Sequence, residues 1–230
     1  KRAGTGIPVA ALPCEGEADL WQVHRWAVGR IKEAGPTPPM PFEATLLELK
    51  VAIARRALGN CRLCAHRCSV DRSRTAAGRC GLGPAATVAE HFVHVGEEAV
   101  INPSLVLSLA GCGLRCRYCQ QGWLLDAGRV AGDELEPRMW SSLDRAGARS
   151  LSFVGGNPDE NLPAVLEFLA GVPEDFDLPV VWNSHAYSSP ETLALLDGVV
   201  DVYVPDLKYG DDACARRWSQ APRSTAVAVL

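Results

Sequence analysis

The spacing of apolar residues predicts two kinds of structure in the first part of the chain. Residues 18–35 and 41–60 carry apolar side chains at helical spacing and are separated by the proline-rich stretch GPTPPMP. We therefore expect region 1–60 to be a small pair of helices. Residues 61–88 show little hydrophobic periodicity and are rich in loop-forming residues. Such a segment needs a bound metal or extensive packing to stay ordered.

From residue 104 the pattern changes to short apolar and β-branched runs that are typical of buried strands. We expect strands at 104–110, 150–154, 179–182 and 200–204. Helical patterns lie between them, near 137–147, 161–170 and 190–197, and each is followed or closed by a glycine, at positions 147, 171 and 198. The alternation predicts an α/β fold with a parallel sheet and right-handed crossovers. The final TAVAVL could begin a fifth strand.

Composition and charge narrow the possible functions. The apolar fraction of 47% predicts an ordinary globular core, and the net charge of −4, with both signs interspersed, argues against a nucleic-acid partner. No apolar run is long enough to predict a membrane helix, and the first residues lack a secretory hydrophobic region, so we expect a cytoplasmic protein. In that compartment the nine cysteines, seven of them in two tight groups, indicate metal ligands rather than disulfides.

The unusual loops all follow predicted strands. The first strand leads into Cys112, the second into GGNPDEN at 155–161, the third into NSH at 183–185, and the fourth into PDLKYGDD at 205–212. In parallel α/β sheets the carboxyl ends of the strands share one edge, which is where ligands bind. We therefore expect these four loops to form a single site.

Three cysteines in LAGCGLRCRYCQQG, residues 109–122, have the spacing C-x3-C-x2-C. Such a trio can bind zinc, form a disulfide with a spare thiol, or hold an iron-sulfur cluster. A structural zinc site requires four protein ligands, and no fourth cysteine or histidine follows closely. A 4Fe-4S cube held by three thiolates leaves one iron open for another molecule.

This motif resembles the signature of the radical S-adenosylmethionine (SAM) superfamily. Together with VGEEAVINPSLVLSLAGCGLRCRYCQQ, FVGGNP and LLDGVVDVYVPDLKYGDD, it resembles the pyruvate formate-lyase activating-enzyme-like branch, over roughly residues 60 to 222. The resemblance implies a parallel-stranded partial (β/α) barrel. It also implies a 4Fe-4S cluster that reductively cleaves SAM to methionine and a 5′-deoxyadenosyl radical, which abstracts a hydrogen from the substrate.

The resemblance also implies roles for individual residues. The cluster ligands would be Cys112, Cys116 and Cys119. The SAM-binding residues would be Tyr118 near the adenine, Gly155 and Gly156 near the amino group, Asn157, Asn183, Ser184, Asp206 and Lys208. Asn157 stands where many relatives carry an acidic residue. Its amide oxygen can accept a hydrogen bond from an ammonium, but the bond lacks the added strength that a charged carboxylate would give. Lys208 can pair with the SAM carboxylate.

The other cysteine group lies in residues 61–88 and follows the pattern C-x2-C-x3-C-x11-C. Its members are Cys61, Cys64, Cys68 and Cys80. Four thiolates close a coordination sphere, so this second site would be structural or electron-carrying, with either zinc or an iron-sulfur cluster. His66 could replace one cysteine, although a surface histidine is the simpler interpretation. Cys14 and Cys214 are isolated and behave as small apolar residues.

The domain plan expected from the sequence is a helical region 1–60, a four-cysteine metal-binding segment 61–88 and a radical-SAM partial barrel 89–230. Four β/α units are fewer than the six that the resemblance implies, so we expect a barrel truncated after about four units, with an exposed sheet edge.

The expected function is a radical-SAM enzyme of the activating-enzyme-like kind. Its electron donor would be a flavodoxin or ferredoxin, and its substrate a glycyl radical enzyme, another peptide or a small molecule. The alternative is a non-catalytic metal-binding interaction module.

Overall fold

The computed structural model describes residues 16–34, 45–173 and 175–228. The α-helices are α1 (Glu17–Ala34), α2 (Leu46–Ala57), α3 (Leu162–Gly171), α4 (Pro190–Leu196), α5 (Asp212–Ser219) and α6 (Ser224–Ala228). The strands are β1 (Thr87–His94), β2 (Ser104–Leu109), β3 (Asp133–Glu134), β4 (Ser150–Gly155), β5 (Val180–Ser184) and β6 (Val202–Pro205). Short 3-10 helices are η2 (Leu58–Asn60), η3 (Gly122–Leu125), η4 (Ala127–Arg129), η5 (Pro137–Ser142) and η6 (Asp159–Asn161).

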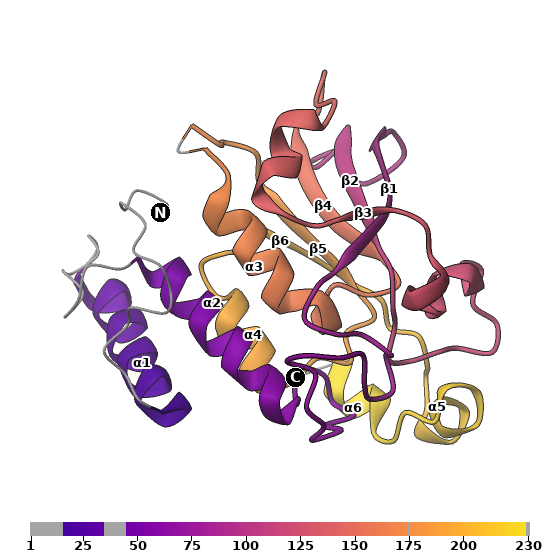
Figure 1. Cartoon of the computed structure of the whole chain (residues 1–230). Helices are drawn as coiled ribbons and strands as arrows, with labels where there is room; N and C mark the ends of the chain where they lie inside the picture. The colour runs from indigo at the N-terminus through magenta and orange to yellow at the C-terminus, as the bar shows by residue number, and fades with distance from the viewer. Residues whose placement is uncertain (1–15, 35–44, 174, 229–230) are drawn as a thin grey trace.

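The strands form one open sheet of mixed but mostly parallel direction. Its six strands lie in the order β3-β1-β2-β4-β5-β6. The strands β2, β4, β5 and β6 are parallel, as the sequence predicts, whereas β1 runs antiparallel to both β2 and β3. The helices α2, α3 and α4 lie together beside the sheet, with α1 outside α2 (Figure 1). An open, mostly parallel sheet is compatible with a partial barrel.

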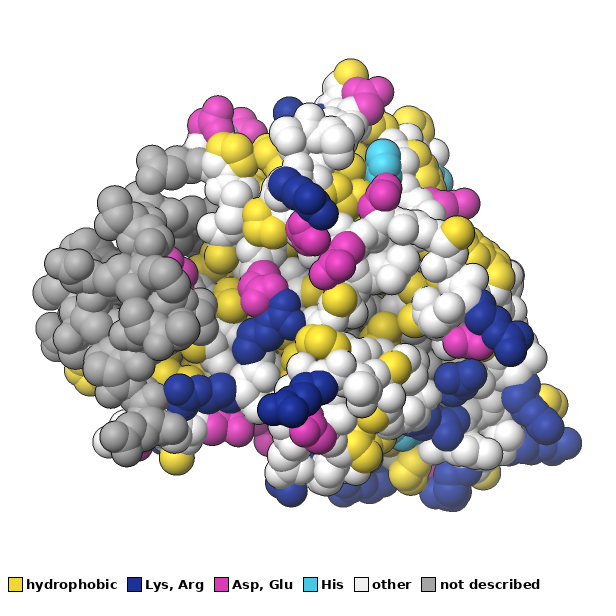
Figure 2. All heavy atoms as spheres, viewed as in Figure 1, with side chains coloured by type: hydrophobic (Ala, Val, Ile, Leu, Met, Phe, Trp, Pro, Cys, Tyr) yellow, Lys and Arg dark blue, Asp and Glu magenta, His cyan; other side chains and the backbone are white. Residues whose placement is uncertain are grey.

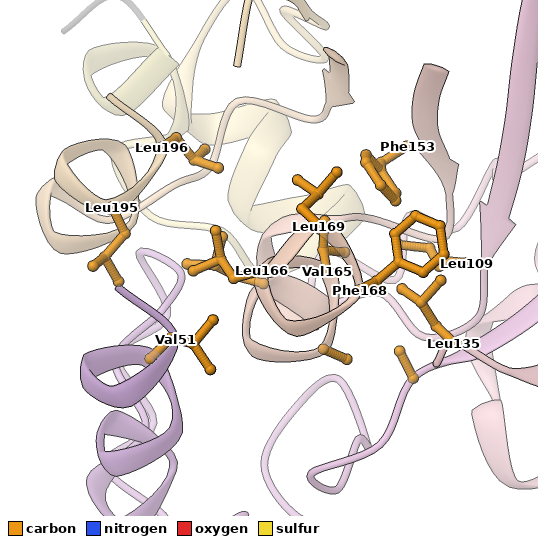
Figure 3. Close-up of a cluster of buried hydrophobic side chains, with 14 of the residues drawn as sticks. Val51, Leu109, Leu135, Phe153, Val165, Leu166, Phe168, Leu169, Leu195 and Leu196 are labelled. Atoms are coloured by element: carbon orange, nitrogen blue, oxygen red, sulfur yellow. The ribbon is translucent and has the colours of Figure 1, made fainter. Parts of the chain in front are cut away.

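The main core lies between the helices and one face of the sheet. Leu105, Leu107 and Leu109 of β2 point to this face, because side chains alternate along a strand. Phe153 of β4 and Phe168 of α3 meet there edge to face, with ring centroids 6.1 Å apart. Figure 3 shows this cluster continuing to the leucines of α4 and to α2. The core therefore fixes the positions of the strand ends that follow it.

The opposite face of the parallel strands carries small polar residues. Ser150 donates its hydroxyl proton to the Ile101 carbonyl at 2.6 Å, so it accepts from Ser104 of β2 at 2.8 Å, and Ser104 in turn accepts from Ser152 of β4 at 2.7 Å. All three serines are buried. Because each hydroxyl has a partner, this face avoids the cost of unsatisfied polar groups.

Local sequence signals explain where several helices begin. Thr45 caps α2 in a capping box with Glu48, in which each residue's side chain binds the other's backbone N–H. Ser189 caps α4 by accepting from the Thr192 N–H, and Asp211 caps α5 in the same way. The helices predicted within 1–60 and at 161–170 and 190–197 are confirmed as α1 to α4. The prolines of the intervening GPTPPMP stretch lie outside the described residues.

Two predicted elements are wrong. The helical pattern at 137–147 gives only the short η5, since the Asp144 side chain turns the chain back by accepting from the Ala146 N–H at 3.1 Å. The Arg145 guanidinium also takes the carbonyls of Trp140 and Leu143, which a longer helix would need.

The TAVAVL segment is not a strand over its described residues, because they lie in α6. Val227 packs there against the cluster that contains Cys112 and Tyr187, and the Tyr187 hydroxyl donates to the Pro222 carbonyl at 2.8 Å. The chain after α5 therefore folds back over the cysteine loop instead of extending the sheet.

Candidate metal centre

A cavity of about 580 Å³ lies at the carboxyl ends of the four parallel strands. The loops after β2, β4, β5 and β6 all line it, as expected for a parallel sheet. Every residue predicted from the resemblance to bind the cluster or SAM is part of the lining: Cys112, Cys116, Tyr118, Cys119, Gly155, Gly156, Asn157, Asn183, Ser184, Asp206 and Lys208. Residues from four separate loops thus meet in one place.

The loop that carries the three cysteines turns tightly against the cysteine-rich segment 61–88. Cys112 is buried, whereas Cys116 and Cys119 are partly exposed. The Cys119 N–H donates to the Cys116 carbonyl at 3.1 Å, which closes a turn. Gly111 has a φ of 86°, and a Cβ there would lie 2.6 Å from the Leu82 side chain. Only glycine therefore allows the loop to approach this segment so closely.

Two of the three thiols receive a hydrogen bond. The donors are the hydroxyl of Ser219 for Cys116 and the backbone N–H of Gln121 for Cys119, and the His185 ring lies beside Cys112. Burial raises the pKa of Cys119, and the Gln121 N–H lowers it in part. Hydrogen bonds of this kind orient metal-ligating groups and tune the metal that they hold.

The glycine pair after β4 brings two strand ends together. Gly155 has a φ of 101°, and the Gly156 N–H donates to the Leu109 carbonyl at 2.6 Å. A Cβ on Gly156 would lie 2.3 Å from the Gly111 carbonyl oxygen. The pair is therefore required for the close contact between the end of β4 and the loop that follows β2.

Beneath the cavity, Glu160 organises a buried polar network. Its Oε1 accepts from the Gly113 N–H at 2.9 Å and lies 3.3 Å from His185 Nε2, while its Oε2 accepts from Asn157 Nδ2 at 2.5 Å. His185 Nδ1 accepts the Tyr187 N–H, so the ring proton lies on Nε2, toward Glu160. Burial alone would raise the pKa of Glu160, but its partners lower it to about 2. Glu160 is therefore an ionised carboxylate beneath the cysteine loop.

Asn157 is buried within this network. Its side-chain oxygen accepts the His185 backbone N–H at 3.0 Å while its amide donates to Glu160. Asn157 therefore joins the loop after β4 to the loop after β5, in addition to lining the cavity.

Polar groups from β5 and β6 complete the cavity wall. The Ser184 hydroxyl accepts the Ala186 N–H at 3.2 Å, and the Ser184 carbonyl accepts the Asp206 N–H at 2.8 Å. Lys208 pairs with Asp206 at 2.6 Å, and the Tyr118 hydroxyl donates to the Lys208 carbonyl at 3.3 Å. Burial alone would lower the pKa of Lys208, but Asp206 raises it. A charged ammonium is thus present at the cavity.

The second cysteine group lies next to the first. Cys61, Cys64 and Cys80 are buried and Cys68 is exposed. Burial raises the pKa of Cys64 well above its usual value and that of Cys80 to about 11. These two thiols are therefore protonated in the metal-free protein, and a bound metal would have to displace their protons.

Two buried or partly buried arginines connect the two cysteine groups. Arg72 donates to the Cys61 thiol at 3.3 Å and to the Glu160 carbonyl at 2.9 Å. Arg79, one residue before Cys80, donates to the Gly113 carbonyl at 2.7 Å. The segment 61–88 thereby holds the cysteine loop from two sides.

The remaining cysteines and histidines have smaller roles. Cys214 is exposed, and Cys14 lies outside the described residues. His66 stacks edge to face on Tyr187, with ring centroids 4.9 Å apart, and burial lowers its pKa to about 4. Among the described residues, no three His, Cys, Asp or Glu side chains are close enough to hold one metal ion.

Sequence reasoning missed the residues that support the site from outside its loops. These are Glu160, Arg72, Arg79 and Ser219. Glu160 is within the quoted GGNPDEN loop, so its position after β4 was a usable signal. The two arginines and Ser219 gave no local signal, because their partners lie far away along the chain.

The comparisons with known proteins agree with an iron-sulfur assignment. A family model described as a 4Fe-4S single cluster domain matches residues 103–211. This range includes the three cysteines and all four strand-end loops, and it supports an iron-sulfur domain at this position.

A curated relative, an uncharacterized protein of Methanocaldococcus jannaschii, is 34% identical over 215 residues. The alignment covers 88% of this chain and 62% of that protein, so the chain spans less than two thirds of the relative's length. No solved structure matches.

None of the helices in the described part of the chain has the length and apolar character needed to cross a membrane.

Proposed function

We propose that this chain binds a 4Fe-4S cluster through Cys112, Cys116 and Cys119 and binds SAM beside it, as a radical-SAM enzyme. The observation that carries the proposal is the convergence of these thiols with three polar strand-end loops on one cavity of about 580 Å³. When bound, the reduced cluster supplies one electron that splits SAM into methionine and a 5′-deoxyadenosyl radical.

The donor set fits a cluster of this kind. The three thiols are free, and those of Cys116 and Cys119 receive hydrogen bonds. A 4Fe-4S cube uses each cysteine for a different iron, so its ligands need not converge on one point, as the ligands of a single zinc ion must. The glycines at positions 111 and 156 keep the loop close to β4 without a side chain in between.

The chain's own residues would position SAM by charge and hydrogen bonding. Lys208 supplies a cation at the cavity for a carboxylate, and Asn183 and Ser184 supply polar groups at the end of β5. The Tyr118 ring lies at the mouth, 51% exposed, where it can stack on a base. The Gly156 N–H already bonds Leu109, so the glycine pair would contribute close approach rather than a free donor.

The electron donor proposed for this site is an acidic carrier protein such as a flavodoxin or ferredoxin. Four exposed arginines flank the cysteine loop: Arg115 and Arg117 within it, and Arg216 and Arg217 on α5. The Arg117 N–H donates to the Trp218 carbonyl at 3.0 Å, which places α5 beside the loop. Figure 2 shows Lys and Arg side chains gathered on the lower part of the molecule, where Figure 1 places α5. Such a surface favours an acidic partner.

The substrate is proposed only by class. A glycyl radical enzyme, as in the activating-enzyme-like branch, another peptide or a small molecule would each present a hydrogen to the radical. A non-catalytic metal-binding module is the second candidate, and one observation favours it: Lys208 is already paired with Asp206.

Anaerobic reconstitution with iron and sulfide, followed by reduction with SAM, separates these functions. We expect 5′-deoxyadenosine from the wild type and none from Cys116→Ala, because the variant lacks a cluster ligand. Cys214→Ala is the matched control, since Cys214 is exposed and does not line the cavity. Bound zinc with no SAM cleavage by the wild type would favour the interaction module instead.

A further inference from the structure

Helix α5 ends directly on the cysteine loop, although nothing in its sequence predicts a role there. Ser219, its last residue, is only 2% exposed. The Ser219 carbonyl accepts from Arg79 at 2.6 Å. The next residue, Gln220, has a φ of 51° and donates its N–H back to the Arg216 carbonyl at 3.0 Å. The end of α5 is therefore fixed by hydrogen bonds on both sides.

The Ser219 hydroxyl lies 3.1 Å from the Cys116 sulfur. It also hydrogen-bonds the hydroxyl of Tyr209, a residue that is 5% exposed. A serine hydroxyl has one proton, and a metal-bound thiolate can only accept. Ser219 must therefore donate to Cys116, and Tyr209 must donate to Ser219. The two hydroxyls form a directed relay that ends on a sulfur of the proposed cluster.

This relay differs from the contact to Cys119, which receives its hydrogen bond from a backbone N–H within its own loop. The Tyr118 and Tyr209 hydroxyls also lie within hydrogen-bonding reach of Cys116. Ser219 is 103 residues away from Cys116 in the sequence. The relay can be removed by substituting single hydroxyl groups, with the loop backbone left intact.

We propose that Tyr209 and Ser219 are positioning residues that raise the reduction potential of the cluster by donating hydrogen bonds toward Cys116. The inference rests on the proposed function of the trio. One-electron reduction adds negative charge to the cluster and its sulfurs, so a donor to sulfur stabilises the reduced form more than the oxidised form. Because Tyr209 polarises the Ser219 hydroxyl, it strengthens the same bond.

A redox titration of the anaerobically reconstituted full chain, followed by electron paramagnetic resonance, tests the relay. At the wild-type midpoint we expect Ser219→Ala to lower the ratio of reduced to oxidised cluster by about tenfold. That change equals about 59 mV for a one-electron couple. Tyr209→Phe, which keeps the ring and the Ser219–Cys116 bond, should give a smaller shift in the same direction. Ser141→Ala removes an exposed hydroxyl of η5 and is the matched control.

Iron and sulfide contents are measured on every sample. A wild type that assembles no cluster contradicts the proposed function itself. An intact cluster in Ser219→Ala with the wild-type potential overturns the relay alone. If Ser219→Ala loses the cluster, Tyr209→Phe decides: a negative shift supports the relay, and an unchanged potential overturns it.

Discussion

Glu160 accepts hydrogen bonds from three different loops while being almost completely buried. Gly113 belongs to the cysteine loop, Asn157 to the loop after β4 and His185 to the loop after β5. The side chain of Glu160 is 1% exposed. A carboxylate suits this position because it only accepts, and all three neighbours present N–H groups.

Glu160→Gln should lower the free energy of unfolding by about 2 kcal/mol, the order found when a buried hydrogen-bonding group is left without its partner. The amide has one N–H2 group, and it would face either Asn157 or the Gly113 and His185 donors. Urea denaturation of the metal-free protein measures the loss. Glu134→Gln, at an exposed glutamate of β3, should change stability by less than about 0.5 kcal/mol. Equal stability of the two variants would contradict the assignment.

Gly156 has no room for a side chain. Alanine there would place its Cβ 2.3 Å from the Gly111 carbonyl oxygen, and neither atom belongs to a flexible side chain. We expect Gly156→Ala to destabilise the protein by about 2 kcal/mol or more, because the strand end must move. In Gly59→Ala the new Cβ meets nothing within 4 Å, so this control should retain wild-type stability. Urea denaturation curves of Gly156→Ala and Gly59→Ala measure the difference, and equal stability of the two variants would contradict the close contact at Gly156.

At the scale of elements, sequence periodicity predicted the strands and helices whose apolar residues form the core. The strands β2, β4, β5 and β6 were predictable because each is a short apolar run followed by a polar loop, and a parallel sheet places such loops at one edge. The helix α5 was not predictable, because its short sequence DACARRWS is half polar and its position depends on contacts with the cysteine loop. The strand β1 crosses the predicted boundary at residue 88.

The part of the site formed by loops at the strand ends could be predicted, because a parallel sheet brings those loops together. All the residues predicted to bind the cluster or SAM line the cavity, and the order of strands and motifs was enough to identify them. The supporting hydrogen bonds were not, since they join residues 47 positions apart for Gly113 and Glu160, and 88 apart for Arg72 and Glu160. A single sequence holds no record of such pairs, because each residue alone has an ordinary surface or loop interpretation.

Helix α1 carries a histidine that is buried without charge. His24 is 3% exposed, and its Nε2 has no hydrogen-bond partner in the described part of the chain. Burial is the main cause that lowers the pKa of His24 to about 4, and the charges of Lys50 and Arg25 lower it further. The charge of Asp197 acts in the opposite direction. The unfolded histidine titrates near 6.5 and so binds more protons between pH 6.5 and 4.

The contribution of His24 is therefore complete above pH 6.5 and is lost as the pH falls toward 4. After allowance for solvent screening, we expect the free energy of opening of α1 to be about 1 kcal/mol lower at pH 5 than at pH 7. Amide hydrogen exchange within α1 measures this opening. His24→Leu should remove that pH dependence, whereas His91→Gln, at an exposed histidine of β1, should keep it. An unchanged pH dependence in His24→Leu would show that another group is responsible.

At the scale of the whole molecule, the two cysteine groups depend on each other unequally. The segment 61–88 has its own backbone contacts, such as the Cys61 N–H to the Val70 carbonyl at 2.9 Å and the Arg72 N–H to the Leu58 carbonyl at 2.8 Å. The cysteine loop, in contrast, takes the side chains of Arg79 and, through Glu160, Arg72 from that segment. The trio is therefore held in place by the four-cysteine segment more than the reverse.

Metal loading should show the same asymmetry. The spacing of the four cysteines predicts a metal in segment 61–88, and Cys64→Ala combined with Cys80→Ala would remove two of its ligands and much of the order that it supplies. We therefore expect iron at the trio to fall below about half of the wild-type content. In Cys116→Ala any metal bound by the four-cysteine group should be unchanged, because none of that group's cysteines is touched. Metal and sulfide analysis of both variants, reconstituted in parallel, measures the two directions. Equal losses in both, or full trio loading in the double variant, would contradict the unequal dependence inferred from the arginine contacts.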